Sequence, residues 1–301
     1  MAFTAKDVQA LREKTGCGMM DCKNALKETD GNMDAAVDYL REKGLASQAK
    51  KASRVAAEGQ VVALVEGGVA AVIEVNSETD FVAGNDEFKE FVNLCAKAVI
   101  ANNPADVDAL IASTYEGKTV GEYKEDIFLK FRENIQIRRF VRIEGKVVSY
   151  VHAGGKIGVL VNFDTELAAD NEGLVAMGKN VAMQIAAMNP AYLDEASVPA
   201  EVLAKEKEIL IAQMKEDPKM ANKPEAVLGK IVEGKIGKYY KENCLVEQAF
   251  IKDDSKKICE LLNGAGAKIN RFAFFVMGEG IEKKSEDLSE EVAKQVAAMK
   301  N

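Results

Sequence analysis

At 301 residues and 48% hydrophobic composition, the chain is long enough for one large core or several small ones, and its length favours two or three domains. No window approaches the ~18 apolar residues of a membrane span. Met1 to Asp7 lead directly into a helical pattern without a targeting leader, so we expect a cytoplasmic protein with no membrane partner. A formal net charge of -8 argues against nucleic-acid binding driven by phosphate contacts.

Side chains that could support chemistry are few. The five cysteines are an odd number without zinc spacing, and the one histidine, His152, lies far from them in sequence. The chain has no phosphate-binding loop, nucleophile elbow or zinc-protease motif, and Gly264 to Lys268 is better explained as a turn into a strand. We therefore expect reduced structural thiols, no catalytic residues, no metal and no cofactor. The cysteines are Cys17, Cys22, Cys95, Cys244 and Cys259.

Residues 1 to about 46 are predicted to form three short helices. Thr4 or Asp7 can begin the first, Asp21 the second and Asn32 the third, which is expected to end at Gly44. The polar, basic residues 48 to 54 then form a linker or a loose helical extension. Met19 and Met20 lie at a turn, where they either fill the small core or contact a partner; we expect one inside and one outside.

An internal duplication organises the middle of the chain. A shift of about 86 residues aligns Gly59 with Gly145 and continues without a gap to Ala105 and Ala191, with roughly a third of about 47 positions identical. Each copy reads as a hairpin closed by a glycine turn, a polar elbow and a helix that stops at Asn-Pro. This pattern predicts an α+β core built from two related subdomains.

The elbow of the first copy, residues 76 to 83, follows an apolar strand and precedes a helical pattern. Phe81 either packs beneath its own helix, with Asp80 satisfying amides near the helix start, or projects toward a partner. The second copy carries Glu166 and Leu167 at these positions, which favours a structural role, whereas the bulkier ring of Phe81 favours a contact.

The remaining segments complete the prediction. Residues 106 to 112 and 120 to 133 read as helices, and 134 to 143 as a strand whose arginines, Arg138, Arg139 and Arg142, either form ion pairs or contact RNA. Residues 199 to 216 and 224 to 242 predict an antiparallel helical hairpin that caps the core or projects as an arm. A strand at 269 to 276 and a closing helix at 289 to 299 follow.

Several motifs together resemble the bacterial translation elongation factor Ts family. The resemblance runs in order from residue 1 to about 284, and its most specific parts are the T-G-C-G-M-M-D-C and T-D-F-V motifs at 15 to 22 and 79 to 82. It is supported by residues 133 to 139, 150 to 161 and 278 to 283. The sequence departs from the family pattern at Phe131 and Arg132, where family members often carry Ile-Gly.

The resemblance implies a ubiquitin-associated-like three-helix domain (1–54), a first core copy (55–144), a second copy (145–268) with the helical hairpin at about 199–242, and a C-terminal module (269–301). It also implies a non-enzymatic activity: guanine-nucleotide exchange on the GTPase elongation factor Tu. The segment Thr79, Asp80, Phe81 and Val82 would intrude beside the partner's nucleotide site and dislodge Mg²⁺. Met19, Met20 and His152 would dock on other partner surfaces, in a homo-oligomer or a two-to-two complex.

Two other classes of function remain open at this level. A plain adaptor would bind a partner without changing its nucleotide release. An RNA-binding protein that uses the three arginines would bind with a steep dependence on salt.

Overall fold

The computed structural model describes residues 3–216 and 224–282, which combine helices with small sheets, so the predicted α+β class is confirmed. Contacts group the chain into two units. Unit 1 comprises residues 1–61, 73–140 and 276–301, and unit 2 comprises 62–72 and 141–275. None of the helices described is both long and apolar enough to cross a membrane. The predicted domain boundaries stay a prediction, and the closing helix at 289 to 299 lies outside the described residues.

The first part of unit 1 is the predicted three-helix module. It consists of α1 (Ala5–Thr15), α2 (Met19–Glu28) and α3 (Met33–Lys51). Thr4 caps α1 in a reciprocal capping box, and the Asn32 side chain accepts a hydrogen bond from the amide of Ala35 at the start of α3. The buried residues of the module are few, as its length predicts: Val8, Leu11, Cys17, Cys22, Ala25, Leu26, Ala36 and Leu40.

The prediction that the third helix ends at Gly44 is wrong. α3 continues without a break to Lys51, so of the segment predicted as a linker or a loose helical extension, residues 48–51 belong to the helix. Gly44 instead permits a close approach: an added Cβ would lie 2.2 Å from Cδ2 of Leu129. A glycine in a helix can signal packing rather than termination, and here the packing partner lies far away in sequence.

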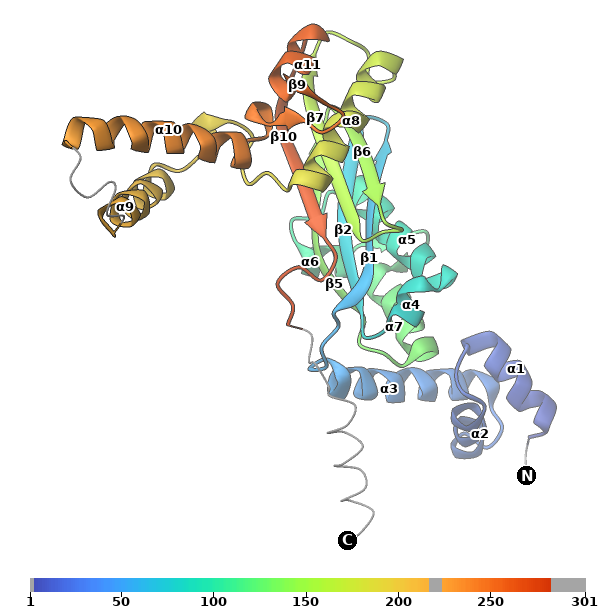
Figure 1. The fold of residues 1–301 in the computed structure, drawn as a ribbon. Helices are drawn as coiled ribbons and strands as arrows, with labels where there is room; N and C mark the ends of the chain where they lie inside the picture. The colour runs from blue at the N-terminus through green and yellow to red at the C-terminus, as the bar shows by residue number, and fades with distance from the viewer. Residues whose placement is uncertain (1–2, 217–223, 283–301) are drawn as a thin grey trace. The chain divides into compact units, whose positions relative to one another are not determined.

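The first core sheet has the strand order β1-β2-β5. Its strands are β1 (Glu58–Glu66), β2 (Val69–Ser77) and β5 (Gln136–Glu144). Between β2 and β5 come α4 (Asp80–Gly84), α5 (Asp86–Asn102), α6 (Val107–Ala112), β3 (Thr114–Tyr115), β4 (Lys118–Thr119) and α7 (Val120–Phe131). Within unit 1, α5 and α7 pack against each other, and α7 also contacts α3 of the module (Figure 1).

The second core sheet lies in unit 2 and has the order β10-β7-β6. Its strands are β6 (Lys146–His152), β7 (Ile157–Thr165) and β10 (Ala267–Val276), and α8 (Glu172–Met188) covers β6 and β7. β6 and β7 are antiparallel, with Val148 opposite Val161. Between α8 and β10 lie a short helix η1 (Glu195–Ser197), then η2 (Leu245–Glu247), β8 (Ala249–Phe250), β9 (Asp253–Lys257) and α11 (Ile258–Gly264).

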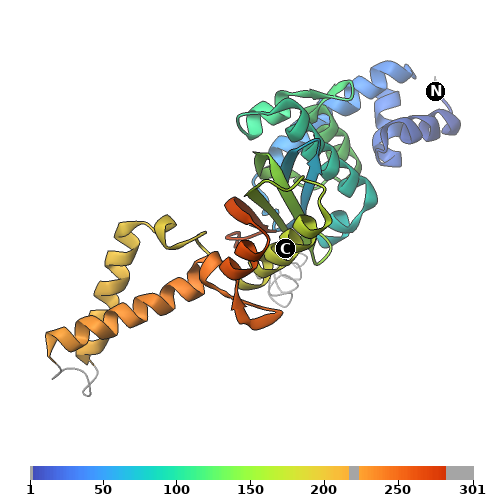
Figure 2. The same cartoon turned by 90° about the horizontal axis from the view of Figure 1, so that it is seen from above.

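The predicted helical hairpin is confirmed as α9 (Ala200–Glu216) and α10 (Glu225–Asn243). Its helices share a small core of their own, which no described residue of the sheet's core joins. Figure 2 shows the two helices standing clear of the β6-β7-β10 sheet within unit 2. The hairpin therefore forms an arm rather than a cap. The core residues of this arm are Leu210, Met214, Val232 and Ile236.

The duplication is visible in matching details of the two copies. The side chains of Asn85 and Asn171 cap α5 and α8, and both helices end on a left-handed asparagine, Asn103 with φ 48° and Asn189 with φ 46°. The two copies therefore use the same start and stop chemistry 86 positions apart, as the sequence predicts.

Candidate partner-binding site

The elbow after β2 holds an exposed aromatic ring. Thr79 is the N-cap of α4, and its hydroxyl accepts a hydrogen bond from the amide of Val82. Phe81 is 88% exposed, whereas Val82 is 6% exposed and anchors the turn. The interpretation in which Phe81 packs beneath its own helix is therefore wrong. Among the described residues Asp80 has no hydrogen-bonding partner for its side chain, so Thr79 rather than Asp80 satisfies the helix start.

A distant carboxylate clamps the base of this elbow. Glu133 accepts hydrogen bonds from the amides of Glu78 at 3.1 Å and Thr79 at 3.0 Å, and from the Thr79 hydroxyl at 2.6 Å. Glu78 in turn accepts a hydrogen bond from the amide of Asn134 at 2.7 Å. Hydrogen bonds to an ionised acceptor are among the stronger ones, so this reciprocal pair fixes the backbone at which the elbow begins.

The far end of the elbow is also held. The buried side-chain amide of Gln60 donates to the carbonyl of Ala83 at 2.9 Å. At the beginning of the elbow, the Ser77 hydroxyl also donates to the carbonyl of Thr79 at 3.0 Å. The ring of Phe81 is thus exposed on a turn whose backbone is fixed at both ends. An exposed aromatic on a preorganised turn is the arrangement that contact residues of interfaces have.

Met19 and Met20 lie in the first turn of α2 and are 45% and 63% exposed. The expectation that one of them is buried is wrong, because the apolar face of α2 that fills the core begins later, at Cys22, and continues with Ala25 and Leu26. Two adjacent exposed methionines form an adaptable apolar surface in the same unit as Phe81.

His152 lies in unit 2, at the end of β6. Its ring is exposed and stacks on Tyr150 at 5.9 Å between centroids, and its Nδ1 lies 2.8 Å from the tyrosine hydroxyl. These two contacts with Tyr150 fix the orientation of the exposed imidazole of His152.

Two of the three predicted basic residues form ion pairs with a buried carboxylate. Glu74 is fully buried and accepts hydrogen bonds from Arg138 at 3.0 Å, Arg139 at 2.6 Å and the amide of Gly278 at 2.7 Å. Burial raises the pKa of Glu74, but these hydrogen bonds outweigh burial and hold it below its ordinary value. Arg142 pairs with Glu144. The ion-pair interpretation of the arginines is confirmed.

Within residues 3–216 and 224–282, no group of three or more histidine, cysteine or acidic side chains could hold a metal ion. All five cysteines are free, as predicted, and four of them are buried. Burial raises the pKa of Cys95, and raises that of Cys244 to about 11, so both are protonated thiols near neutral pH.

Sequence reasoning missed the residues that support the site. Glu133 belongs to a run used for the family resemblance, but it received no role because its partners are 54 and 55 residues away. Glu74 did carry a signal, since a carboxylate within an apolar strand calls for a buried partner, and the predicted strand with Arg138 and Arg139 could have supplied it.

Comparison with known proteins gives consistent matches. The family model described as elongation factor TS matches residues 78–279. Proteins named elongation factor Ts are similar along nearly their whole length. The protein from Syntrophotalea carbinolica is 47% identical over 97% of this chain and 99% of its own. The protein from Clostridium perfringens is 48% identical over 97% and 98%, and that from Halothermothrix orenii 45% identical over 98% and 99%.

Proposed function

This chain belongs to the elongation factor Ts family, and from that premise we propose that it binds elongation factor Tu and promotes exchange of bound GDP for GTP during translation elongation in the cytoplasm. Such a role needs no chemical catalysis. An exchange factor binds the nucleotide-free partner more tightly than the nucleotide-bound one, and by linkage the nucleotide weakens binding of the factor by the same ratio.

The exposed ring of Phe81 is the observation that carries this proposal. If the ring enters an apolar crevice that opens only in the nucleotide-free partner, its burial contributes about 1.5–3 kcal/mol to that state alone. A difference of this size corresponds to about a ten- to hundredfold change in nucleotide affinity. The clamp by Glu133 supports the role, because a turn that is already ordered loses little entropy when it binds.

We propose that the same insertion dislodges the partner's Mg²⁺. Magnesium requires near-octahedral coordination, so a small displacement of its ligands weakens its binding. In this arrangement Thr79 and Val82 hold the turn, while Asp80 and Phe81 project from it. The carboxylate of Asp80, which pairs with no side chain among residues 3–216 and 224–282, would add like-charge repulsion beside the nucleotide phosphates, in the nucleotide-bound state only.

Two further surfaces are proposed to hold the partner. The exposed pair Met19 and Met20 would dock on the GTPase domain, and His152 would meet another domain of the partner. A one-to-one and a two-to-two complex both fit this assignment. The proposal includes no direct contact with nucleic acid.

Release of fluorescent GDP from elongation factor Tu tests the function directly. Catalytic amounts of this protein should accelerate release. Binding without acceleration would support the adaptor alternative and overturn the proposal. Binding to RNA that falls steeply with salt would favour the RNA-binding alternative instead.

A further inference from the structure

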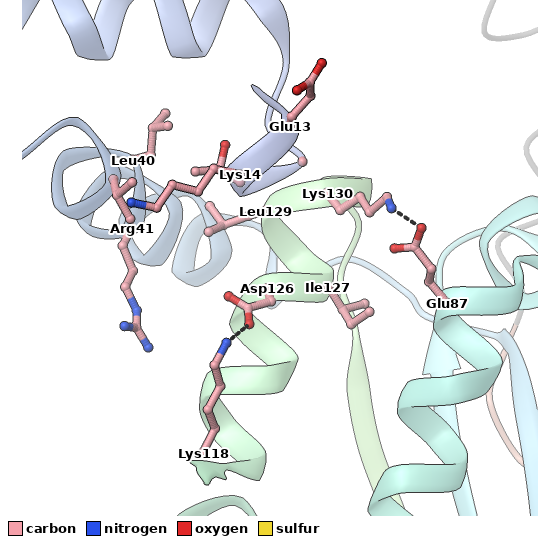
Figure 3. Close-up of a pocket in the computed structure, with 13 residues that line it drawn as sticks. Glu13, Lys14, Leu40, Arg41, Glu87, Lys118, Asp126, Ile127, Leu129 and Lys130 are labelled. Atoms are coloured by element: carbon pink, nitrogen blue, oxygen red, sulfur yellow. Dashed lines mark hydrogen bonds and ion pairs between the residues drawn. The ribbon is translucent and has the colours of Figure 1, made fainter. Parts of the chain in front are cut away.

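Helix α7 packs directly against the three-helix module. Leu129 projects from α7 toward the side of the module that carries Leu40 (Figure 3), and both side chains belong to the module's buried cluster. Leu129 is 7% exposed and lies directly against Gly44 of α3. Leu129 of α7 is therefore part of the core of the three-helix module, although α7 begins at Val120, 69 positions after the module ends at Lys51.

Ion pairs surround this apolar contact. Arg41 on α3 pairs with Glu122 at 3.0 Å and with Glu125 at 3.2 Å, both on α7. At the other end of α7, Arg132 pairs with Asp21 on α2 at 3.0 Å. Asp21 lies one residue after Met20, so the Arg132 pair connects the end of α7 to the exposed methionines.

The conformation of Arg132 is unusual for its residue type. It caps α7 with φ 57°, in the left-handed region that non-glycine residues seldom adopt. Its carbonyl accepts a hydrogen bond from Lys51 at the end of α3. A strained backbone persists only where surrounding contacts determine it, so these contacts from α2 and α3 support a functional constraint at this junction.

The next two residues hold the elbow. Glu133 clamps Glu78 and Thr79, and the side chain of Asn134 donates to the carbonyls of Ala52 at 3.2 Å and Arg54 at 2.7 Å, which follow α3. The C-terminal end of α7 thus contacts both the module and the elbow within three consecutive residues.

We propose that α7 positions the Met19–Met20 surface and Phe81 at a fixed separation, with Gly44 and Arg132 as positioning residues. The inference rests on the proposed function, because it treats the two surfaces as two contacts with one partner. Once the first contact has formed, the second surface is present at a higher effective concentration if the two are held at the correct spacing than if a flexible chain joins them.

A bulky side chain at Gly44 tests the contact between α7 and the three-helix module. Gly44→Leu should push the module away from Leu129 while improving the helix propensity of α3, so the helix itself should persist. Spin labels at Met20→Cys and Phe81→Cys, in a Cys259→Ser background, report the distance between the two surfaces in the free protein. We expect a narrow distribution in the parent, a broad one in Gly44→Leu, and about tenfold slower exchange by the unlabelled variant.

A second variant tests the same contact without changing core packing. Arg41→Gln combined with Arg132→Gly removes the ion pairs of α3 and α2 with α7 and relieves the left-handed strain at Arg132, so the fold should be preserved. Nucleotide exchange should slow about three- to tenfold, and the distance distribution should broaden. Two matched controls should change neither readout. Gly234→Leu adds a side chain on α10 where a Cβ meets nothing within 4 Å, and Asp126→Asn removes the ion pair between α7 and Lys118 of β4, which does not involve the module.

An unchanged distance distribution in Gly44→Leu, or a broad one in the parent, would overturn the inference. So would broadened distances with unchanged exchange. Failure of the proposed function is distinguishable, because then the parent protein itself would not accelerate GDP release, whereas the distances are measured without any partner.

Discussion

The two copies of the duplicated core end their second strand in different elbows. In the first copy, the Thr79 hydroxyl donates to the Glu133 carboxylate, a short helix begins and Phe81 is exposed. In the second copy, the Thr165 hydroxyl donates to the carbonyl of Gly266 at 3.0 Å, and residues 166–170 form bends and turns rather than a short helix. Leu167 packs partly buried against the core of its sheet.

The difference shows that the local sequence pattern does not decide the exposure of the apolar residue. Both elbows contain threonine, an acid and an apolar side chain, but the group opposite the threonine differs. A carboxylate has two oxygens and accepts three hydrogen bonds at the first elbow, whereas a single carbonyl accepts one at the second. The first elbow is therefore rigid without burying its ring, and the ring is available to a partner.

The largest effect is expected from Phe81→Ala. Because the ring is exposed, truncation should leave the thermal midpoint nearly unchanged, while GDP release from elongation factor Tu should slow about ten- to a hundredfold. Stopped-flow release and calorimetry of the free protein measure the two quantities. A large loss of stability would mean that the ring is buried in solution, and the comparison between the elbows would fail.

Leu167→Ala, at the matching position of the second copy, should have the opposite profile. Its side chain is partly buried against the sheet, so truncation should cost about 1–3 kcal/mol of unfolding free energy and leave exchange at saturating protein unchanged. Denaturant unfolding followed by circular dichroism gives the free energy. Slower exchange by a folded Leu167→Ala protein would assign a partner contact to both elbows.

Glu133→Gln sharpens the comparison at the clamp itself. The amide keeps the shape but replaces an acceptor oxygen with a donor that faces the Glu78 or Thr79 groups, so exchange should slow about three- to tenfold as the turn loosens. Hydrogen exchange at the amides of Glu78 and Thr79 should accelerate in parallel. Thr165→Val is the control, which removes the hydroxyl that donates to Gly266 and accepts from the amide of Leu167 at the second elbow, and it should not affect nucleotide release.

The smallest expected effect is the loss of folding stability at low pH that Glu74 causes. Glu74 of the first copy occupies the position of Leu160 in the second, and the folded-state pKa of Glu74 is lowered from 4.5. A lowered pKa stabilises the fold above the unfolded-state value, and this contribution is lost as pH falls through the folded-state value. The stability gap between the wild type and Glu74→Gln should therefore shrink as pH falls below about 5.5, about one unit above the ordinary pKa of a glutamate. Residue-resolved unfolding by NMR should locate the change in unit 1, and a gap independent of pH would contradict the assignment.

Much of the fold could be predicted because its signals are local. Asn85 and Asn171 begin helices, the asparagines before Pro104 and Pro190 end them, and the alternating pattern around Arg138 marks a strand. Each of these features depends on residues within a few positions of one another.

What could not be predicted depends on contacts between distant segments. Gly44 looks like a helix end until Leu129 is placed against it, and Phe81 looks like a core residue until the tertiary fold leaves it outside. The clamp by Glu133 spans more than 50 residues, so no local propensity encodes it. Tertiary context decides such cases, and it decides them at the candidate site.

The most direct test of the account compares GDP release from elongation factor Tu with and without bound Mg²⁺, for the parent protein and for Phe81→Ala. If the ring acts by dislodging the metal, the variant should release GDP about ten- to a hundredfold more slowly than the parent when Mg²⁺ is bound, and the difference should largely disappear when Mg²⁺ is absent. Equal defects under both conditions would contradict the account and assign Phe81 to docking alone.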